Sequence, residues 1–134
     1  TGWFKYKAGE TFTDKAGNVV AGKKDRGDIY AALYEAPSSD FSLDGNLFPN
    51  GTGIDEHIVL LARIPEQEMT ETGDWKKFNL EFTPQNGKTL NAEDLKNGKY
   101  KLAVVFSSSV MGANFQGAVG SELWIDEVEI ICEN

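Results

Sequence analysis

Apolar and polar residues alternate with a period of two along much of the chain. The alternation is cleanest over residues 77–82 and 99–106, where every second side chain is apolar. Less regular versions of the same pattern cover residues 2–8, 28–35 and 57–64. Because successive side chains of a β-strand point to opposite faces of a sheet, this period predicts half-buried strands.

Turn signals separate these segments. The pair Asn86-Gly87 is one of several that favour tight turns, since type I′ turns need positive φ at both central residues. Residues 89–95 are the one stretch with helical character, and we expect a single turn that is capped by Asn91 and ended by Gly98. Many short strands with little helix predict an all-β fold, a two-sheet antiparallel β-sandwich of the jelly-roll type.

The last strand-like segment interrupts its own alternation. Leu123 and Ile125 share one face, but the next apolar residues, Val128 and Ile130, fall on the other. One extra residue at 126–127 would return all four to the core, so we predict a β-bulge there. The predicted core of the sandwich consists of Phe78, Leu80, Phe82, Leu102, Val104, Phe106, Leu123, Ile125, Val128 and Ile130.

Length and net charge limit the number of domains and the kinds of partner that the chain is expected to have. The chain has 134 residues, enough for one core, and we treat residues 1–134 as a single domain. Thirteen basic and 21 acidic residues give a net charge of -8, which disfavours nucleic acid as a partner and favours a monomer. No apolar run approaches the ~20 residues that span a bilayer, so no membrane insertion by this segment is expected. The chain starts at Thr1 without a signal peptide, which suggests a domain of a longer protein.

Catalytic and cofactor sites have weak support. His57 is the single histidine, and the sequence offers it neither a Gly-x-Ser-x-Gly elbow nor a second histidine or a cysteine pair for zinc. We therefore predict no catalytic residue and no required cofactor. A facing pair of carboxylates would suit a glycoside hydrolase, but we interpret the carboxylates near strand ends as solvated charges: Glu35, Asp55, Glu66, Glu68, Glu122, Asp126 and Glu127.

Two places are candidates for calcium. Residues 40–46 begin like an EF-hand loop, with Asp40 and Asp44 at its first and fifth positions, but Gly51 stands where a bidentate Glu is required. Asp126, at the predicted bulge, is the stronger candidate. Its short carboxylate could either help to bind a structural calcium ion or accept hydrogen bonds from backbone groups that the bulge frees.

Outward-facing aromatic residues are the candidate ligand contacts, because sugars stack their C–H surfaces on aromatic rings. Trp124 lies between two predicted core residues and therefore points away from the core. Trp3 is expected to share an outer face with Lys5 and Lys7.

The remaining large aromatic residues divide between surface and core. Tyr30 and Tyr34 occupy one face of their strand, opposite its aliphatic residues, and we assign them to the ligand site with Trp124 and Trp3. Trp75 directly precedes a predicted strand with an apolar face, and we expect it in the core.

Several segments, taken in order, resemble one known family. The most specific is the tail motif Gly-Ser-x-Leu-Trp-Ile-Asp-Glu-Val, and the others lie in residues 2–6, 28–35, 72–78, 97–102 and 105–109. The chain resembles the putative carbohydrate metabolism domain of gut Bacteroidetes proteins, a C-terminal jelly roll related to carbohydrate-binding modules. The resemblance implies a cell-envelope protein linked to glycan use, with an immunoglobulin-like domain upstream. It also implies a structural calcium ion near the first strand, which is common in related modules.

Three functional hypotheses follow. The first is a non-catalytic carbohydrate-binding module, with carbohydrate as its partner, exported to the cell surface or periplasm. The second is a structural or adhesin-like β-sandwich that binds protein and has no sugar site. The third is a glycoside hydrolase with paired carboxylates. An exposed row of aromatic residues would favour the first hypothesis, and two facing carboxylates in a deep cleft would favour the third.

Overall fold

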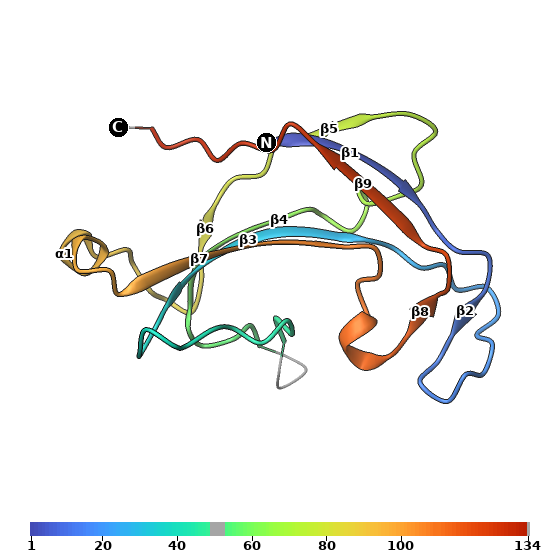
Figure 1. The fold of residues 1–134 in the computed structure, drawn as a ribbon, viewed down its shortest axis with the longest axis horizontal. Helices are drawn as coiled ribbons and strands as arrows, with labels where there is room; N and C mark the ends of the chain where they lie inside the picture. Colours follow the sequence, from blue (N-terminus) through green and yellow to red (C-terminus); the bar gives the residue numbers. More distant parts are fainter. Residues whose placement is uncertain (49–52, 134) are drawn as a thin grey trace. The chain divides into compact units, whose positions relative to one another are not determined.

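The structure is a computed structural model that describes residues 1–48 and 53–133. Its regular elements are short antiparallel strands, with one five-residue helix and one 3-10 turn in the described part of the chain (Figure 1). The prediction of an all-β antiparallel fold of the β-sandwich class is confirmed. The chain divides into two compact units. The first comprises Thr1–Ile29, Ile64–Leu80 and the stretch from Phe106 onward, and the second comprises Tyr30–Arg63 and Glu81–Val105.

The first unit contains a three-stranded antiparallel sheet with β1 (Gly2–Lys7) at its centre (Figure 1). One neighbour is β5 (Lys76–Phe78) and the other is β9 (Glu122–Asp126). A separate two-stranded sheet pairs β2 (Phe12–Thr13) with β8 (Gly117–Ala118), which follows the 3-10 turn η1 (Gly112–Asn114). Because β1 is the central strand, both of its edges are hydrogen-bonded to neighbouring strands. Its inner and outer faces position the side chains of the core and of the candidate site.

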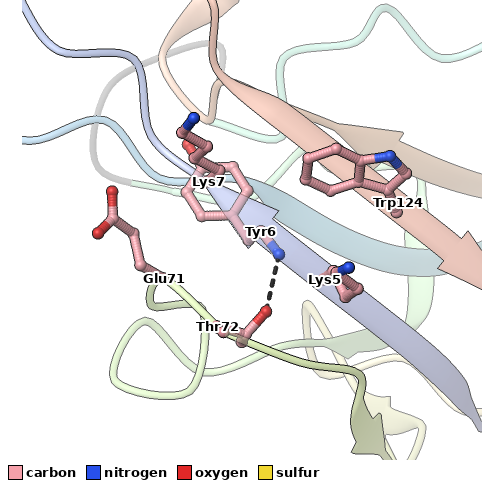
Figure 2. A pocket seen from close by; sticks show the side chains of 7 residues that line it. Lys5, Tyr6, Lys7, Glu71, Thr72 and Trp124 are labelled. Atoms are coloured by element: carbon pink, nitrogen blue, oxygen red, sulfur yellow. Dashed lines mark hydrogen bonds between the residues drawn. The ribbon is translucent and has the colours of Figure 1, made fainter.

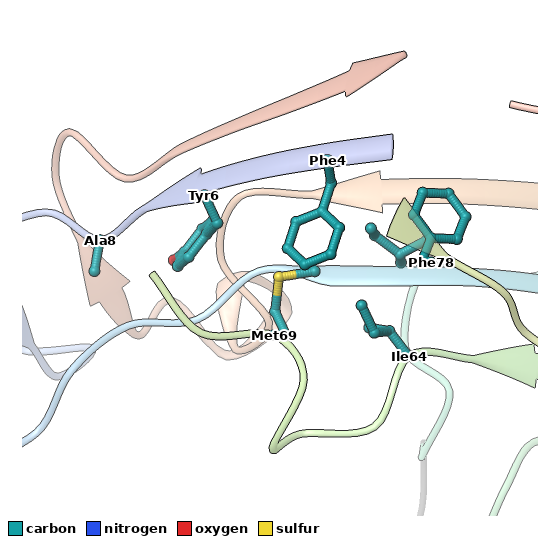
Figure 3. Packing of buried hydrophobic residues seen from close by; sticks show 7 residues of the cluster. Phe4, Tyr6, Ala8, Ile64, Met69 and Phe78 are labelled. Atoms are coloured by element: carbon teal, nitrogen blue, oxygen red, sulfur yellow. The ribbon is translucent and has the colours of Figure 1, made fainter. Parts of the chain in front are cut away.

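The inner face of β1 builds the core of the first unit. Phe4 and Tyr6 are fully buried, and Met69 packs beside them (Figure 3). Burying a side chain of this size contributes about 1.5–3 kcal/mol to folding. The complete cluster consists of Phe4, Tyr6, Ala8, Ile29, Ile64, Met69 and Phe78.

The buried carboxylate of Asp25 connects the end of the three-stranded sheet to the two-stranded sheet through hydrogen bonds. Asp25 is 5% exposed, and its Oδ2 accepts hydrogen bonds from the Ala118 amide at 2.9 Å and the Ser121 hydroxyl at 2.8 Å. Its Oδ1 accepts a third from the Ser109 hydroxyl at 2.9 Å, and Ser121 Oγ in turn accepts one from the Gly9 amide at 3.0 Å. A buried charge is tolerated when it is hydrogen-bonded in this way, so Asp25 has a structural role.

The second unit is built on a four-stranded antiparallel sheet. Its order is β6 (Thr83–Pro84), β4 (Ile58–Arg63), β3 (Asp28–Glu35) and β7 (Tyr100–Ser107). The buried side chains on one face of this sheet and in the segments beside it form the second cluster, which consists of Tyr30, Ala32, Tyr34, Leu47 and Ile58. Ala103 and Val105 of β7 pack against it.

The predicted turn and helix signals are confirmed. Asn86 and Gly87 have φ values of 57° and 65°, as a type I′ turn requires. Helix α1 (Ala92–Lys96) begins at Asn91, whose side chain accepts two first-turn N–H groups at 2.9 and 3.0 Å, and Gly98 follows with φ at 69°. Within the described residues no helix has the length and apolar character that a membrane span requires.

The predicted bulge after β9 is also confirmed. Asp126 pairs with Trp3, but Thr1 exchanges two hydrogen bonds with Glu129, at 2.8 and 2.9 Å, where a regular ladder would place the preceding residue. One residue is therefore extra on the β9 side. Glu127 takes up the distortion with a left-handed φ of 49°.

The predicted core list is partly wrong. Phe78 is buried, and the half-buried members are Leu80, Phe82, Leu123 and Ile125. Five predicted core residues are instead 40–46% exposed: Leu102, Val104, Phe106, Val128 and Ile130. Both faces of β7 carry apolar side chains, and the opposite face, with Ala103 and Val105, packs on the second cluster. A period of two separates the faces of a strand without saying which face is buried more deeply.

Candidate functional site

The outer face of β1 carries Trp3, Lys5 and Lys7, as the sequence predicted. These three side chains alternate with Phe4 and Tyr6, which point into the core. Strand alternation therefore gives one three-stranded sheet an apolar inner face and an outer face of indoles and ammonium groups.

Two tryptophans flank Lys5 on this outer face, one in β9 and one just before β5. The Lys5 Nζ lies 5.8 Å from the Trp75 ring centroid and 5.5 Å from the Trp124 ring centroid. Trp124 is the cross-strand partner of Lys5, and Trp75 directly precedes β5 on the other side. Two strand spacings put the backbones of Trp75 and Trp124 about 10 Å apart. We call this surface, composed of Trp3, Lys5, Trp75 and Trp124, the tryptophan face; it holds all three tryptophans of the chain.

A pocket of about 500 Å³ lies beside Trp124 (Figure 2). The indole, the Lys5 and Lys7 side chains and the 71–73 segment surround it. Its lining residues are Lys5, Tyr6, Lys7, Glu71, Thr72, Gly73 and Trp124. An aromatic surface next to a few polar groups is the usual composition of a small-ligand site.

Hydrogen bonds hold the polar wall of the pocket in place. The Tyr6 amide donates to Thr72 Oγ1 at 3.0 Å (Figure 2), and the Thr72 amide donates to the Tyr6 carbonyl at 3.0 Å. Glu71 Oε1 accepts from the Ala8 amide at 3.2 Å, and its Oε2 lies 3.5 Å from Lys24 Nζ. The 71–72 segment therefore continues the edge of β1 beyond β5 and presents a largely preformed wall.

Tyr6 links the pocket to the core beneath it. Its ring is 1% exposed and its hydroxyl donates to the Ser108 carbonyl at 2.9 Å. Burial raises the pKa of Tyr6 to about 12, because the phenolate would lose its hydration. Tyr6 is therefore a neutral anchor for the strand that carries Lys5 and Lys7.

The four aromatic residues that the sequence proposed as ligand contacts do not lie together. Trp124 is 41% exposed and Trp3 shares its sheet face, so their outward orientation is confirmed. Tyr30 and Tyr34 are only 6% and 5% exposed, and the expectation that they face outward is wrong. Their rings form part of the second cluster, because the tyrosine face of β3 is the more deeply buried one.

Trp75 was also misplaced by sequence reasoning. It is 41% exposed and belongs to the tryptophan face, not to the core. In β5 the inward residue is Phe78, which is buried, so Lys77 faces outward together with Trp75. Extending the period of two one residue upstream of the strand would have found this position.

The Asp126 carboxylate caps the bulge. Its Oδ1 accepts the Glu127 amide at 2.8 Å, at the residue with the left-handed backbone. Residues 1–48 and 53–133 contain no group of three or more His, Cys, Asp or Glu side chains placed to hold a metal ion. A calcium ion at Asp126 would therefore depend on backbone carbonyl oxygens.

The EF-hand-like loop is organised by hydrogen bonds within the protein. Asp44 Oδ1 accepts the Asn46 amide at 2.6 Å, and the Lys101 ammonium donates to the carbonyls of Ser39 and Phe41 at 2.5 and 2.6 Å. These hydrogen bonds already use the two backbone carbonyls on either side of Asp40, which leaves fewer oxygen ligands for calcium there. The predicted twelfth position, Gly51, lies outside the described residues.

His57 has a packing role in the second unit. Its Nδ1 lies 2.8 Å from Asp55 Oδ1, and the Phe41 ring packs against the imidazole with centroids 4.6 Å apart. Neither Asp55 nor Phe41 supplies a nucleophile for acyl transfer.

Comparisons with known proteins place the domain among carbohydrate-related proteins. It is similar to a crystal structure of a putative glycoside hydrolase from Bacteroides thetaiotaomicron, with 45% identity and a TM-score of 0.86 over 99% of this chain. It is also similar to a putative glycoside hydrolase from Bacteroides vulgatus, with 38% identity and a TM-score of 0.83 over 98% of this chain. The matches span 37% and 50% of those two proteins, respectively.

Two further comparisons complete the assignment. No curated protein matches the chain. The model of one family, the putative carbohydrate metabolism domain, matches residues 1–131. The chain therefore belongs to the putative carbohydrate metabolism domain family, as its sequence motifs suggested.

Proposed function

We propose that this domain is a non-catalytic carbohydrate-binding module and that the tryptophan face, with its adjoining pocket, is the binding site. The observation that carries the proposal is the gathering of all three tryptophans on one outward sheet face, beside a pocket with ordered polar groups. Burying indoles would stabilise the domain, so half-exposed indoles on both sides of Lys5 favour a ligand contact.

The geometry suits a saccharide. A pyranose ring offers an apolar C–H surface to an indole and hydroxyl groups to neighbouring donors and acceptors. Trp75 and Trp124 are separated by about two strand spacings, ~10 Å, which is comparable with the length of a disaccharide. The pocket also contains the Lys7 ammonium group and the Thr72 hydroxyl group, which can form hydrogen bonds with the sugar hydroxyl groups.

The carboxylates of the pocket favour binding over hydrolysis. Glu71 is the one acidic residue among the described residues that line it, and its two oxygens already contact the Ala8 amide and Lys24. Glycoside hydrolysis ordinarily requires two carboxyl groups that flank the scissile bond. In a larger protein of the length of its solved neighbours, this domain would attach the protein to glycan at the cell surface or in the periplasm.

A glycan-array screen followed by titration of the best oligosaccharide tests the proposal. We expect Trp124→Ala and Trp75→Ala each to weaken binding by about 30-fold, since truncating an aromatic hot spot costs about 2 kcal/mol or more. Phe115→Ala is the matched control, because Phe115 is 72% exposed and also lies under a lysine, with Lys15 Nζ 5.6 Å from its ring centroid.

The outcomes separate the hypotheses. Tryptophan variants that bind like the wild type would remove the tryptophan face as the site. A domain that binds no glycan on the array would favour the structural or protein-interaction hypothesis. Release of reducing sugar from the bound glycan would favour the hydrolase.

A further inference from the structure

Three lysines are interleaved with the tryptophans without carboxylate partners. Lys5, Lys7 and Lys77 lie on the outer face of the β5-β1-β9 sheet, and none forms an ion pair with any described residue. Three other described lysines, Lys24, Lys88 and Lys99, do form ion pairs with carboxylates. These ammonium groups give the face local positive charge in a protein with a net charge of -8.

The carboxylates around the pocket do not cancel this charge. Glu71 is already compensated by Lys24, 3.5 Å away, and by the Ala8 amide. Across the β1–β9 pairing, Asp126 faces Trp3 and Glu122 faces Lys7, and neither carboxylate forms an ion pair with a described lysine. Among the residues that line the pocket, two ammonium groups, those of Lys5 and Lys7, therefore stand against one carboxylate, that of Glu71.

The position of Lys5 brings its positive charge next to the aromatic surface. Its ammonium lies between two indole rings, at 5.8 and 5.5 Å from their centroids, so the aromatic surface and the charge coincide. A contact of this kind at an exposed site is worth about 0.5–1 kcal/mol, enough to bias where the lysine points. Lys7 stands two residues along the same strand and also lines the pocket (Figure 2).

We propose that the tryptophan face and its pocket bind an anionic saccharide, whose ring packs on Trp124 while its acidic group is bound by Lys5 and Lys7. This inference rests on the proposed function and names the ligand class of the same site. An ammonium group offers three donors and a compact charge, which suits a single acidic substituent on a sugar. A uronate carboxylate and a sulfate ester present the same chemistry here.

Paired probes test the charge separately from the sugar. One pair is polygalacturonate and its carboxyl-reduced, neutral form, and the other is dextran sulfate and dextran. Calorimetric titrations of the domain at low and moderate salt should show at least about tenfold tighter binding to one anionic probe than to its neutral counterpart. The preference should shrink as salt rises, because screening weakens exposed charge pairs. Which pair shows it distinguishes a carboxylate from a sulfate ligand.

Variants then assign the preference to the two lysines. Lys5→Met and Lys7→Met should each remove most of the anionic preference, while Lys15→Met, which removes the lysine over Phe115, should leave it intact. Equal binding of charged and neutral forms, abolished in both cases by Trp124→Ala, would overturn the anionic inference and leave the proposed function standing. An anionic preference that survives both lysine substitutions would overturn the assignment to this face. Absence of binding to every glycan on the array would remove both proposals together.

Discussion

The two faces of β1 differ in their surroundings, because the inner face is buried in the core and the outer face is exposed. On the inner face Phe4 and Tyr6 are 0% and 1% exposed and pack against Met69. On the outer face Lys5 lies between Trp75 and Trp124, which are both 41% exposed. Residues of similar size and aromatic character therefore stand on both sides of one sheet, but only one side excludes water.

The difference shows why aromatic content alone does not identify a binding site. The inner aromatic residues alternate with charged ones along β1, and the outer tryptophans are interleaved with lysines across the sheet. Substitutions on the inner face should change stability, and substitutions on the outer face should change binding with little cost in stability.

The largest expected effect is on the inner face. Phe4→Ala should lower the free energy of unfolding by about 3–5 kcal/mol, because a fully buried ring leaves a cavity among close-packed neighbours. Chemical denaturation followed by circular dichroism measures it. Phe4→Leu serves as the control and should cost less. A Phe4→Ala variant as stable as the wild type would show that the inner face is not the core of this unit.

Alkaline pH should weaken the inner face through Tyr6. Its pKa is raised from 10 to about 12 by burial, so the folded state holds the phenol proton more tightly than the unfolded state. The stability that this provides is fully present below pH 10 and is lost as pH rises to 12, a change of roughly 2–3 kcal/mol.

Tyr6→Phe isolates this effect from other groups that titrate at high pH. The variant lacks the 2.9 Å hydrogen bond to the Ser108 carbonyl and should be less stable than the wild type at pH 8. Its deficit should shrink steadily in denaturation curves recorded from pH 10 to 12. A deficit that stays constant across this range would mean that Tyr6 titrates normally.

The bulge at the end of the sheet should respond more weakly. Asp126→Ala removes the acceptor of the Glu127 amide and should cost about 0.5–2 kcal/mol, as the loss of a helix cap does. Glu127→Gly should be neutral or stabilising, because glycine adopts the φ of 49° without strain. A Glu127→Gly variant that loses more than Asp126→Ala would contradict this account of the bulge. Calcium that raises the melting temperature of the wild type but not of Asp126→Ala would instead assign an ion to this carboxylate.

The smallest expected change in stability is on the outer face. Lys5→Met should lower the free energy of unfolding by no more than about 1 kcal/mol, the value of exposed cation–π contacts. Thermal melts of this variant and of Trp124→Ala check it. Losses of the size expected for Phe4→Ala would show that the tryptophan face is structural.

Much of the fold was predictable from local chemistry. The strands 28–35 and 57–64, the cap at Asn91 and the bulge at 126–127 follow from alternation, side-chain acceptors and a slip in register. The depth of burial was not predictable, because Tyr30 and Leu102 lie on strands whose two faces are both apolar. Only tertiary packing decides between such faces.

About half of the candidate site was predictable from the sequence. Trp3, Lys5 and Trp124 follow from alternation within their own strands. Trp75 and Thr72 join them through pairing with β1, a contact between residues about 70 positions apart in sequence. No local pattern contains that pairing, although the period of two, extended upstream of β5, gives the outward direction of Trp75.

The most direct test of the central claim is a two-dimensional NMR titration that follows the three indole N–H signals of the domain. The ligand is the oligosaccharide that binds best on the glycan array, and Trp→Phe variants assign each signal. We expect the Trp75 and Trp124 signals to move most and the Trp3 signal to move as well, while backbone signals of the second cluster, such as those of Tyr30 and Tyr34, stay in place. Indole signals that remain still while amides elsewhere shift on saturation would contradict the account, because the sugar would then bind away from the tryptophan face.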